Sequence, residues 1–508
     1  MLRELEPYAT GLGPYGLAGV LLLSTLVFLL APSYGSRLPL INGKGRFEFQ
    51  STNAKRRFVQ NAQNLIQAGL AKTNVFRIIT ENGEKTILSP KYATELRSHH
   101  ALNFGLSVAD EFHSTLPGFE PFAEGTSVES ILQDAIRTKL TQSLGNVTEP
   151  LSSETALALS TVLTDSPDWH EVNLKSTILR IVAQLSSKVF LGDRICRDPA
   201  WLRITVTYTV NSFLAAQDLR MWPRPLRRFA NWFLPSCRKI REQLKEAREI
   251  ITPVIEERRA AKEAALKEGR EPERYVDAMQ WMEESAKGRP YNPTLAQISF
   301  SVAAIHTTSD LLTQVLFDIA GKDDLVKELR EEVINVIQDE GWKKATLYKL
   351  RLMDSVLKET QRVKPIAIAS MRRLVQEKLT LSDGTVIPRG SNILVSTNRM
   401  WDESVYPNAE TYDPYRFLRL REVPGHETSA QCVSPSPDHM AFGFGKHACP
   451  GRFFAINEVK IALCHILLKY EFKLAEGCKV IPMKNGISLN SDPRAKVAFR
   501  RRKEELVI

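Results

Sequence analysis

Cysteine is scarce in this 508-residue chain: its six cysteines form no C-x-x-C pair and follow no regular spacing. A disulfide framework or a zinc ribbon needs such paired spacings. We therefore expect free and mostly buried thiols in a reducing compartment. The cysteines are Cys196, Cys237, Cys432, Cys449, Cys464 and Cys478.

Motifs that bind nucleic acids or dinucleotides are also missing. The chain has no zinc finger, basic zipper, RNA-binding aromatic motif or Gly-rich dinucleotide fingerprint, and no internal repeat. Its formal net charge is +10. That charge therefore favours an anionic membrane surface or an acidic protein partner, and we expect no nucleic acid as a partner.

Charged residues are absent between Glu6 and Arg37, and the stretch from Tyr15 to Pro32 is almost wholly apolar. A helix of about 20 such residues crosses a bilayer. Basic residues follow from Arg37 onward, which places the remainder of the chain in the cytosol. A cleaved signal peptide is the weaker alternative, because little positive charge precedes the apolar stretch.

These features predict three parts of the chain. Residues 1–36 form an N-terminal membrane anchor with one transmembrane helix at about 15–32. Residues 37–55 form a connector that contains proline and glycine, and residues 56–508 form one large domain.

Within the large domain, helical periodicity dominates from about residue 127 to 363 and again from 451 to 470. A hairpin is expected at 74–89, with Asn82-Gly83 as its turn, and short strands at 377–396. The pattern predicts a mainly α fold with small β-sheets.

The loop before the last predicted helix surrounds one cysteine with the spacing Phe442-x-x-Gly445-x-x-x-Cys449-x-Gly451. A helix N-terminus offers free N–H groups that keep a thiolate ionised, and glycines let the backbone approach a metal ligand closely. Haem iron held by one thiolate fits this chemistry. The alternatives are a structural cysteine under a Gly-rich turn and a zinc site made by His439, His447 and Cys449, which would lack a fourth ligand.

This loop resembles the haem-binding signature of the cytochrome P450 family. The resemblance implies a haem b cofactor whose iron is bound by Cys449, with Phe442, Gly445, His447 and Gly451 in contact with it. The family usually has arginine two places before the cysteine, and this chain has His447 there. Histidine is a weaker and pH-sensitive donor to a haem propionate.

Other segments carry the same resemblance. "LKETQRVKP" contains Glu359 and Arg362, which share one helix face, and "YDPYRF" supplies Arg416 as the third member of a buried structural triad. In the family, a segment such as "IAIASMRRLV" ends in an arginine that binds a propionate. We assign that role to Arg373, with Arg372 second, and leave Arg137 and Lys139 open as further contacts.

"SFSVAAIHTTSDLL" resembles the helix that crosses the distal face of the haem. Thr307 is the expected proton relay to dioxygen, because its hydroxyl can bond back to a carbonyl. His306 stands where the family has an acid. It either shuttles protons or is a satisfied core histidine. The phrase "AAIHTTS" looks like the fungal branch that includes ent-kaurene oxidases.

The resemblance implies the cytochrome P450 fold and a haem-thiolate monooxygenase that uses O2. The expected substrate is a bulky hydrophobic molecule, terpenoid-like or another fungal secondary metabolite. It would lie between the Thr307 helix, the stretch 366–369, the loop near Phe112 to Phe122, and the turn at 484–490. The rivals are a haem-thiolate isomerase or dehydratase and a non-enzymatic haem-binding membrane protein.

The same resemblance implies an electron-donating partner, because the chain has no flavin domain of its own. The expected partner is an NADPH–cytochrome P450 reductase, whose acidic surface would suit a basic patch with Lys446 and Arg452. As in microsomal relatives, the expected location is the endoplasmic reticulum membrane, with a single pass and a cytosolic catalytic domain.

Overall fold

The computed structural model describes residues 19, 38–46, 48, 50–127, 130–506 and 508. The chain divides into two compact units, Met1–Pro39 and Leu40–Ile508, and the second is described below. The predicted membrane helix at 15–32 lies outside the described residues except for Gly19. Among the residues that are described, no helix is both long enough and apolar enough to cross a membrane.

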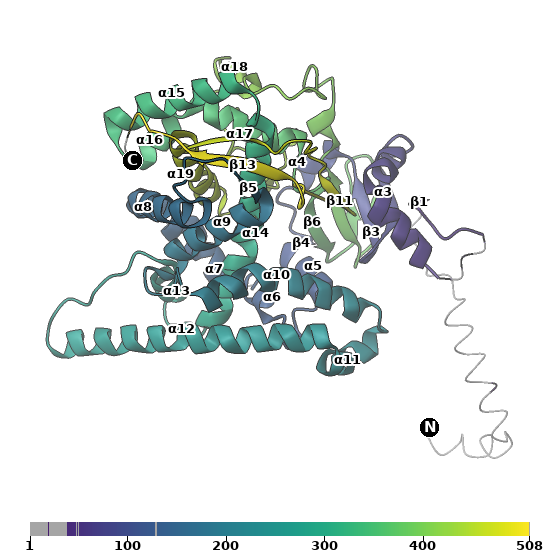
Figure 1. Cartoon of the computed structure of the whole chain (residues 1–508). Helices are drawn as coiled ribbons and strands as arrows, with labels where there is room; N and C mark the ends of the chain where they lie inside the picture. The colour runs from purple at the N-terminus through teal and green to yellow at the C-terminus, as the bar shows by residue number, and fades with distance from the viewer. Residues whose placement is uncertain (1–18, 20–37, 47, 49, 128–129, 507) are drawn as a thin grey trace. The chain divides into compact units, whose positions relative to one another are not determined.

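Helices make up most of the second unit, which confirms the predicted mainly α class (Figure 1). The α-helices described are α3 (Thr52–Leu70), α4 (Ala93–Leu96), α5 (Phe104–Phe112), α6 (Glu120–Glu124), α7 (Ile131–Asp134), α8 (Leu144–Leu163), α9 (Leu174–Leu191), α10 (Pro199–Arg220), α11 (Arg227–Phe233), α12 (Pro235–Lys267), α13 (Ala278–Ala286), α14 (Pro293–Ile319), α15 (Asp323–Glu340), α16 (Lys344–Lys349), α17 (Arg351–Val363), α18 (Arg416–Arg421) and α19 (Arg452–Lys469). Shorter helical turns are η1 (Pro90–Tyr92), η2 (Ala135–Leu140), η3 (Arg224–Leu226), η4 (Asn398–Trp401) and η5 (Gly445–His447).

The strands form small separate sheets. One has the order β1-β2-β3-β9-β6-β4, a second β10-β13-β5, and two further sheets pair β11 with β12 and β7 with β8. Their bounds are β1 (Leu40–Ile41), β2 (Val75–Thr80), β3 (Gly83–Leu88), β4 (Leu102–Asn103), β5 (His170–Asn173), β6 (Ala369–Val375), β7 (Leu379–Thr380), β8 (Val386–Ile387), β9 (Asn392–Ser396), β10 (Tyr470–Leu474), β11 (Met483–Asn485), β12 (Ser488–Asn490) and β13 (Lys496–Arg501).

The predicted hairpin at 74–89 is present, but its turn lies one residue earlier than expected. Thr80 pairs with Gly83, so Glu81 and Asn82 form the two-residue loop. Gly83 already belongs to β3 and has a φ of +101°, which glycine adopts at little cost.

Helix α14 lies in the interior of the unit, where it packs against α9, α12, α10, α6, α17 and α19 (Figure 1). It begins where Asn292 accepts a hydrogen bond from the backbone N–H of Leu295 at 3.1 Å, with Pro293 in its first turn. Apolar residues along α14 are buried on several sides, as a central helix requires. This position brings Thr307 into the middle of the fold.

Candidate active site

The Cys449 loop is closed by backbone hydrogen bonds. The N–H of Cys449 donates to the carbonyl oxygen of Phe442 at 2.8 Å, and the N–H of Lys446 donates to that of Arg97 at 2.9 Å. Gly445 has a φ of +78°, and a Cβ there would lie 2.3 Å from the Arg97 carbonyl oxygen. Only glycine fits this close approach, which accounts for part of the glycine in the motif.

The Cys449 thiol lies among opposing influences. Burial dominates and holds its pKa above the ordinary value, and the backbone N–H groups of Gly451 and Arg452 at the start of α19 offset only part of that rise. Part of the residue's surface is nevertheless accessible, whereas Cys196, Cys237, Cys432 and Cys464 are buried. A cysteine that is not fully enclosed by protein suits a ligand to a bound group. All six cysteines are free, as predicted.

A zinc site at this loop finds no support in the geometry. Among the described residues, the only grouping close enough to hold one metal ion is Glu154, Asp193 and Cys196. His439 hydrogen-bonds through Nε2 to the carbonyl oxygen of Lys358 at 3.2 Å. The described geometry therefore does not support a zinc site made by His439, His447 and Cys449.

Arg373 is a buried cation that has no anionic partner among the residues that the structure describes. Its Nη1 donates to the carbonyl oxygen of Arg372 at 2.6 Å, and its buried Nη2 has no hydrogen-bond partner. Burial lowers the pKa of Arg373 to about 10. Arg372 instead pairs with Glu111 at 3.2 Å. Of the two arginines, Arg373 is the one that needs an anion, and its contact with a propionate stays a prediction.

The neutral ring of His447 and the cation Arg137 lie near the same place. The Phe104 ring lies 5.9 Å from the His447 ring and 5.7 Å from the guanidinium of Arg373. Burial, and then the charge of Arg373, lower the pKa of His447 to about 4. Arg137 donates to the carbonyl oxygen of Lys446 at 3.0 Å, whereas Lys139 pairs with Glu284. A cofactor with carboxylate groups fits this set.

Thr307 lies on an accessible face of α14. Its Oγ1 donates to the carbonyl oxygens of Ala303 at 3.0 Å and of Ala304 at 3.2 Å. Ala303 and Thr307 are exposed, although α14 is surrounded by other helices. Neighbouring side chains therefore leave small side chains and one hydroxyl of α14 uncovered, and the helix continues through this turn without a break.

His306 points to a neighbouring helix. Its Nε2 hydrogen-bonds to the carbonyl oxygen of Val206 in α10 at 2.8 Å, and burial lowers its pKa. This geometry gives the ring a structural partner, and the predicted role in proton transfer stays a prediction.

The structure brings the predicted triad together. Arg362 forms two 2.8 Å hydrogen bonds with the carboxylate of Glu359, and Nε of Arg416 lies 3.2 Å from that carboxylate. Glu359 and Arg362 are completely buried. Arg362 also donates to the carbonyl oxygens of Met400 and Ala409 at 2.7 and 2.8 Å. The network is complete, as a buried charge network must be.

Sequence comparison decides the family. The family model "Cytochrome P450" matches residues 130–499. The chain belongs to the cytochrome P450 family. It is 55% identical to cytochrome P450 monooxygenase adrA of Penicillium rubens, with 97% of each chain covered. It is 47% identical to cytochrome P450 monooxygenase trt6 of Aspergillus terreus, with 99% of this chain and 100% of that one covered.

A solved structure shows the same fold. The structure titled "Retinoic acid bound cyanobacterial CYP120A1" aligns with a TM-score of 0.66 at 17% identity, over 92% of this chain and 100% of that one. The protein is thus a cytochrome P450 monooxygenase. The monooxygenase relatives disfavour both the isomerase or dehydratase and the non-enzymatic alternative.

The residues of this P450 fit haem b with a cysteine thiolate as axial ligand. When bound, the haem iron supplies oxygen activation. Cys449 would supply the thiolate, and the N–H groups of Gly451 and Arg452 would stabilise its charge. Arg373 would pair with a propionate, and His447 and Arg137 lie beside it. Thr307 can hold a proton at Oγ1 on the accessible face of α14.

Sequence reasoning missed Arg97. The segment that carries it is remote from the motif in sequence, and its contribution to the loop is a backbone carbonyl. A carbonyl leaves no trace in side-chain identity, so no signal in the sequence could have found it.

Proposed function

We propose that this P450 is anchored in the endoplasmic reticulum membrane and oxidises a bulky hydrophobic molecule, a terpenoid-like fungal secondary metabolite. One oxygen atom of O2 enters a C–H or C=C bond, and the other leaves as water. An NADPH–cytochrome P450 reductase delivers the two electrons, and two protons complete the water.

The observation that carries the proposal is the accessible face of α14 with Ala303 and Thr307. Apolar rings on α5, α6 and α10, of which α6 and α10 pack against α14, support a hydrophobic substrate. The ring of Phe112 stacks on that of Phe122 with centroids 4.3 Å apart. The ring of Phe213 packs edge-on against that of Phe112, with centroids 4.8 Å apart. The relatives from Penicillium and Aspergillus support a fungal metabolite, and the "AAIHTTS" phrase supports the terpenoid class.

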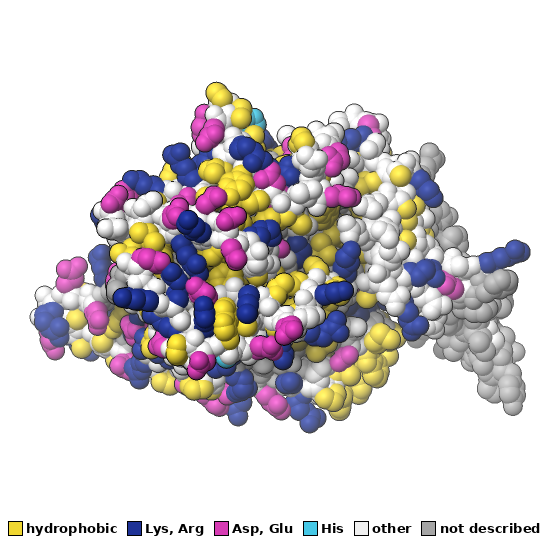
Figure 2. Space-filling model, turned by 45° about the horizontal axis from the view of Figure 1, so that its top comes forward, with side chains coloured by type: hydrophobic (Ala, Val, Ile, Leu, Met, Phe, Trp, Pro, Cys, Tyr) yellow, Lys and Arg dark blue, Asp and Glu magenta, His cyan; other side chains and the backbone are white. Residues whose placement is uncertain are grey.

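Exposed apolar side chains support a membrane-facing surface in addition to the anchor. They follow α10 and continue through η3 and α11, where Met221 is 78% exposed and Phe229 and Phe233 are each 63% exposed. Hydrophobic side chains gather at the lower right of Figure 2, toward the side on which Figure 1 draws α11. Such a surface can enter the interfacial region of a bilayer.

Lys446 and the net charge support a reductase with an acidic surface. Lys446 is exposed on the loop that precedes Cys449. The guanidinium of Arg452 is engaged by the carbonyl oxygens of Val433 and Cys449 at 3.0 and 2.8 Å. Lys446 is therefore the better candidate of the two for a charge contact with the reductase.

Two experiments test the proposal. A carbon monoxide difference spectrum of the reduced full-length protein should show a strongly red-shifted Soret band that is absent in Cys449→Ser. With reductase, NADPH and vesicles, a panel of cyclic terpenoids should yield oxygenated products, and matched fatty acids should not. Product from fatty acids alone would contradict the substrate class. Product formed without NADPH would contradict the proposal that a reductase delivers the electrons.

The anchor has its own test. Removal of residues 1–36 should weaken membrane association, with the surface at α11 as the remaining contact, while the carbon monoxide spectrum is retained. Membrane association equal to that of the full chain would contradict the proposed anchor, and leave the surface at α11 as the attachment.

A further inference from the structure

Asp310 lies one helical turn after Thr307 in α14 and is 3% exposed. Nζ of Lys175 contacts its Oδ1 at 3.0 Å, and Nζ of Lys364 contacts its Oδ2. Burial alone would raise the pKa of Asp310, but Lys364 and Lys175 outweigh burial and hold the pKa below its usual value. Asp310 is therefore a buried carboxylate between two cations.

The same carboxylate binds the end of the β11–β12 hairpin. The N–H of Ser491, which directly follows β12, donates to Oδ1 of Asp310 at 2.8 Å. Oγ of Ser491 donates to the backbone carbonyl oxygen of Asp310 at 2.9 Å. Nζ of Lys364 also reaches Oγ of Ser491 at 3.2 Å and the carbonyl oxygen of Leu489 at 3.3 Å.

Lys364 stands two residues before Ile366, where the segment 366–369 begins. This segment and the hairpin are joined by backbone hydrogen bonds. The N–H of Leu489 donates to the carbonyl oxygen of Ile366, and that of Ile368 donates to Ile487, each at 2.9 Å. The two segments therefore form one paired wall, and the Asp310 network joins that wall to α14.

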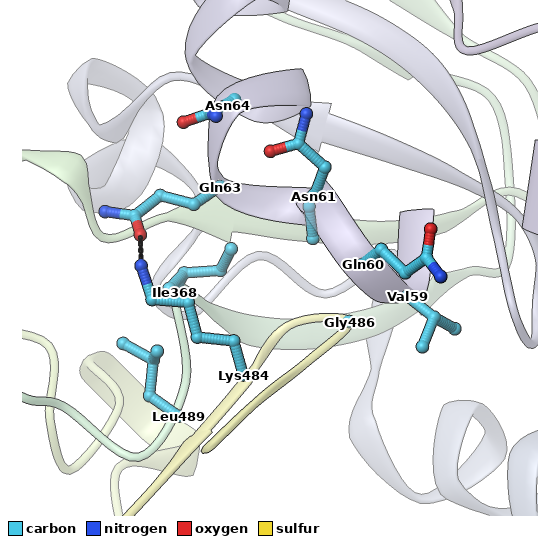
Figure 3. A pocket seen from close by; sticks show the side chains of 10 residues that line it. Val59, Gln60, Asn61, Gln63, Asn64, Ile368, Lys484, Gly486 and Leu489 are labelled. Carbon is cyan, nitrogen blue, oxygen red and sulfur yellow. Dashed lines mark hydrogen bonds between the residues drawn. The ribbon is translucent and has the colours of Figure 1, made fainter. Parts of the chain in front are cut away.

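The other end of the hairpin rests on α3 through fewer contacts (Figure 3). The N–H of Gly486 donates to the carbonyl oxygen of Val59 at 2.9 Å, and Nζ of Lys484 contacts Oε1 of Gln63 at 3.2 Å. A cavity of about 140 Å³ separates the hairpin from α3 beside these contacts. The position of the hairpin relative to α14 is therefore fixed at its Ser491 end, which binds the buried Asp310, and not at its Lys484–Gly486 end.

We propose that Asp310 is a positioning residue that sets substrate specificity, because its carboxylate holds the paired wall of 366–369 and β11–β12 against the α14 turn that follows Thr307. The inference rests on the proposed function and on the predicted substrate position between the Thr307 helix, the stretch 366–369 and the turn at 484–490. Without the carboxylate the wall shifts. Bulky ligands are then held less well, while a small ligand that reaches only the iron is unaffected.

The test uses Asp310→Asn in the full-length holoenzyme. Asparagine keeps the shape and an oxygen for the Ser491 N–H, but it removes the charge that Lys175 and Lys364 need. Asp277→Asn is the matched control, because Asp277 is 2% exposed and pairs with Arg258 at 2.7 Å, with no contact to the wall. The probes are imidazole and clotrimazole, whose binding is followed by the Soret shift.

We expect Asp310→Asn to weaken clotrimazole binding about tenfold and to change imidazole binding by less than about twofold. Amide hydrogen exchange of 366–369 and 484–491 should also become faster. Asp277→Asn should change neither. If both variants merely lower the melting temperature, with clotrimazole affinity and exchange of the wall unchanged, Asp310 is only structural and the inference is overturned.

A second variant and one further outcome allow the inference to be tested even if Asp310→Asn or clotrimazole binding fails. If Asp310→Asn does not load haem, Ser491→Ala removes only the hydroxyl contacts and should weaken clotrimazole binding about threefold. Unchanged binding in that variant would overturn the inference. If the unaltered protein binds imidazole but not clotrimazole, the proposed bulky hydrophobic site fails. Hydrogen exchange of the wall still decides the role of Asp310.

Discussion

The hydroxyl of Thr307 donates to the carbonyl oxygen of Ala303 at 3.0 Å, on the accessible face of the central helix. This places a proton-bearing oxygen on an exposed residue of a helix that other helices surround. Thr307→Ala should retain haem and NADPH oxidation, while product per NADPH falls roughly tenfold or more, because the relay is lost. The measurement is product and hydrogen peroxide formed per NADPH.

Neighbouring residues provide the controls. The hydroxyl of Thr308 is buried without a hydrogen-bond partner, so Thr308→Val should leave coupling unchanged. His306→Gln keeps a donor for the Val206 carbonyl but cannot transfer protons. Coupling near that of the unaltered protein would assign His306 a structural role, and a loss would assign it to the relay. Full coupling in Thr307→Ala would remove Thr307 from the mechanism.

Removing one partner of the triad should prevent stable folding. Glu359→Gln leaves Arg362 completely buried with a weakened partner, at a cost of about 3–5 kcal/mol. The yield of haem-containing protein should fall sharply. Arg419→Ala is the control, since Arg419 is 61% exposed in its pair with Asp413 and such pairs contribute about 0–1 kcal/mol. Equal yields from both variants would refute the structural role of the triad.

Contacts between residues close in the sequence could be predicted, whereas most contacts between distant segments could not. Glu359 and Arg362 are three residues apart on one helix, so their contact followed from helix geometry. The glycine at 445 was explained only by the fold, because Arg97 approaches it from a distant segment. The pairing of Arg372 with Glu111 likewise depends on how β6 lies against α5. Asp310 carried no signal, since its partners come from three separate segments.

Replacing Arg373 should have opposite effects on two properties, the stability of the haem-free protein and the retention of haem. Its guanidinium is buried with Nη2 unpaired, which costs free energy unless an anion is present. Arg373→Met should therefore stabilise the haem-free protein by about 1–3 kcal/mol and hasten haem loss roughly tenfold. Urea unfolding and haem transfer to an acceptor apoprotein measure the two effects. Slower haem loss, or a less stable haem-free protein, would exclude a propionate contact.

Glu458 should make stability depend on pH. Its side chain in α19 is completely buried, and Oγ of Ser186 donates to Oε1 at 2.8 Å while Oε2 has no partner. Burial raises the pKa of Glu458 to about 8, from an ordinary value of 4.5. Between these values the folded state keeps a proton that the unfolded state releases, so this residue's contribution to stability falls as pH rises from 4.5 to 8.

Glu458→Gln removes that titration while keeping the size and the acceptor for Ser186. The variant should be more stable than the unaltered holoenzyme at pH 8 by a few kcal/mol, since one unit of pKa shift corresponds to about 1.4 kcal/mol, and the difference should shrink at pH 5.5. Urea unfolding at both pH values is the measurement. Glu149→Gln, an exposed site on α8, should show no such difference. A gain that is equal at both pH values would mean that Glu458 is ionised in the fold or affects packing alone.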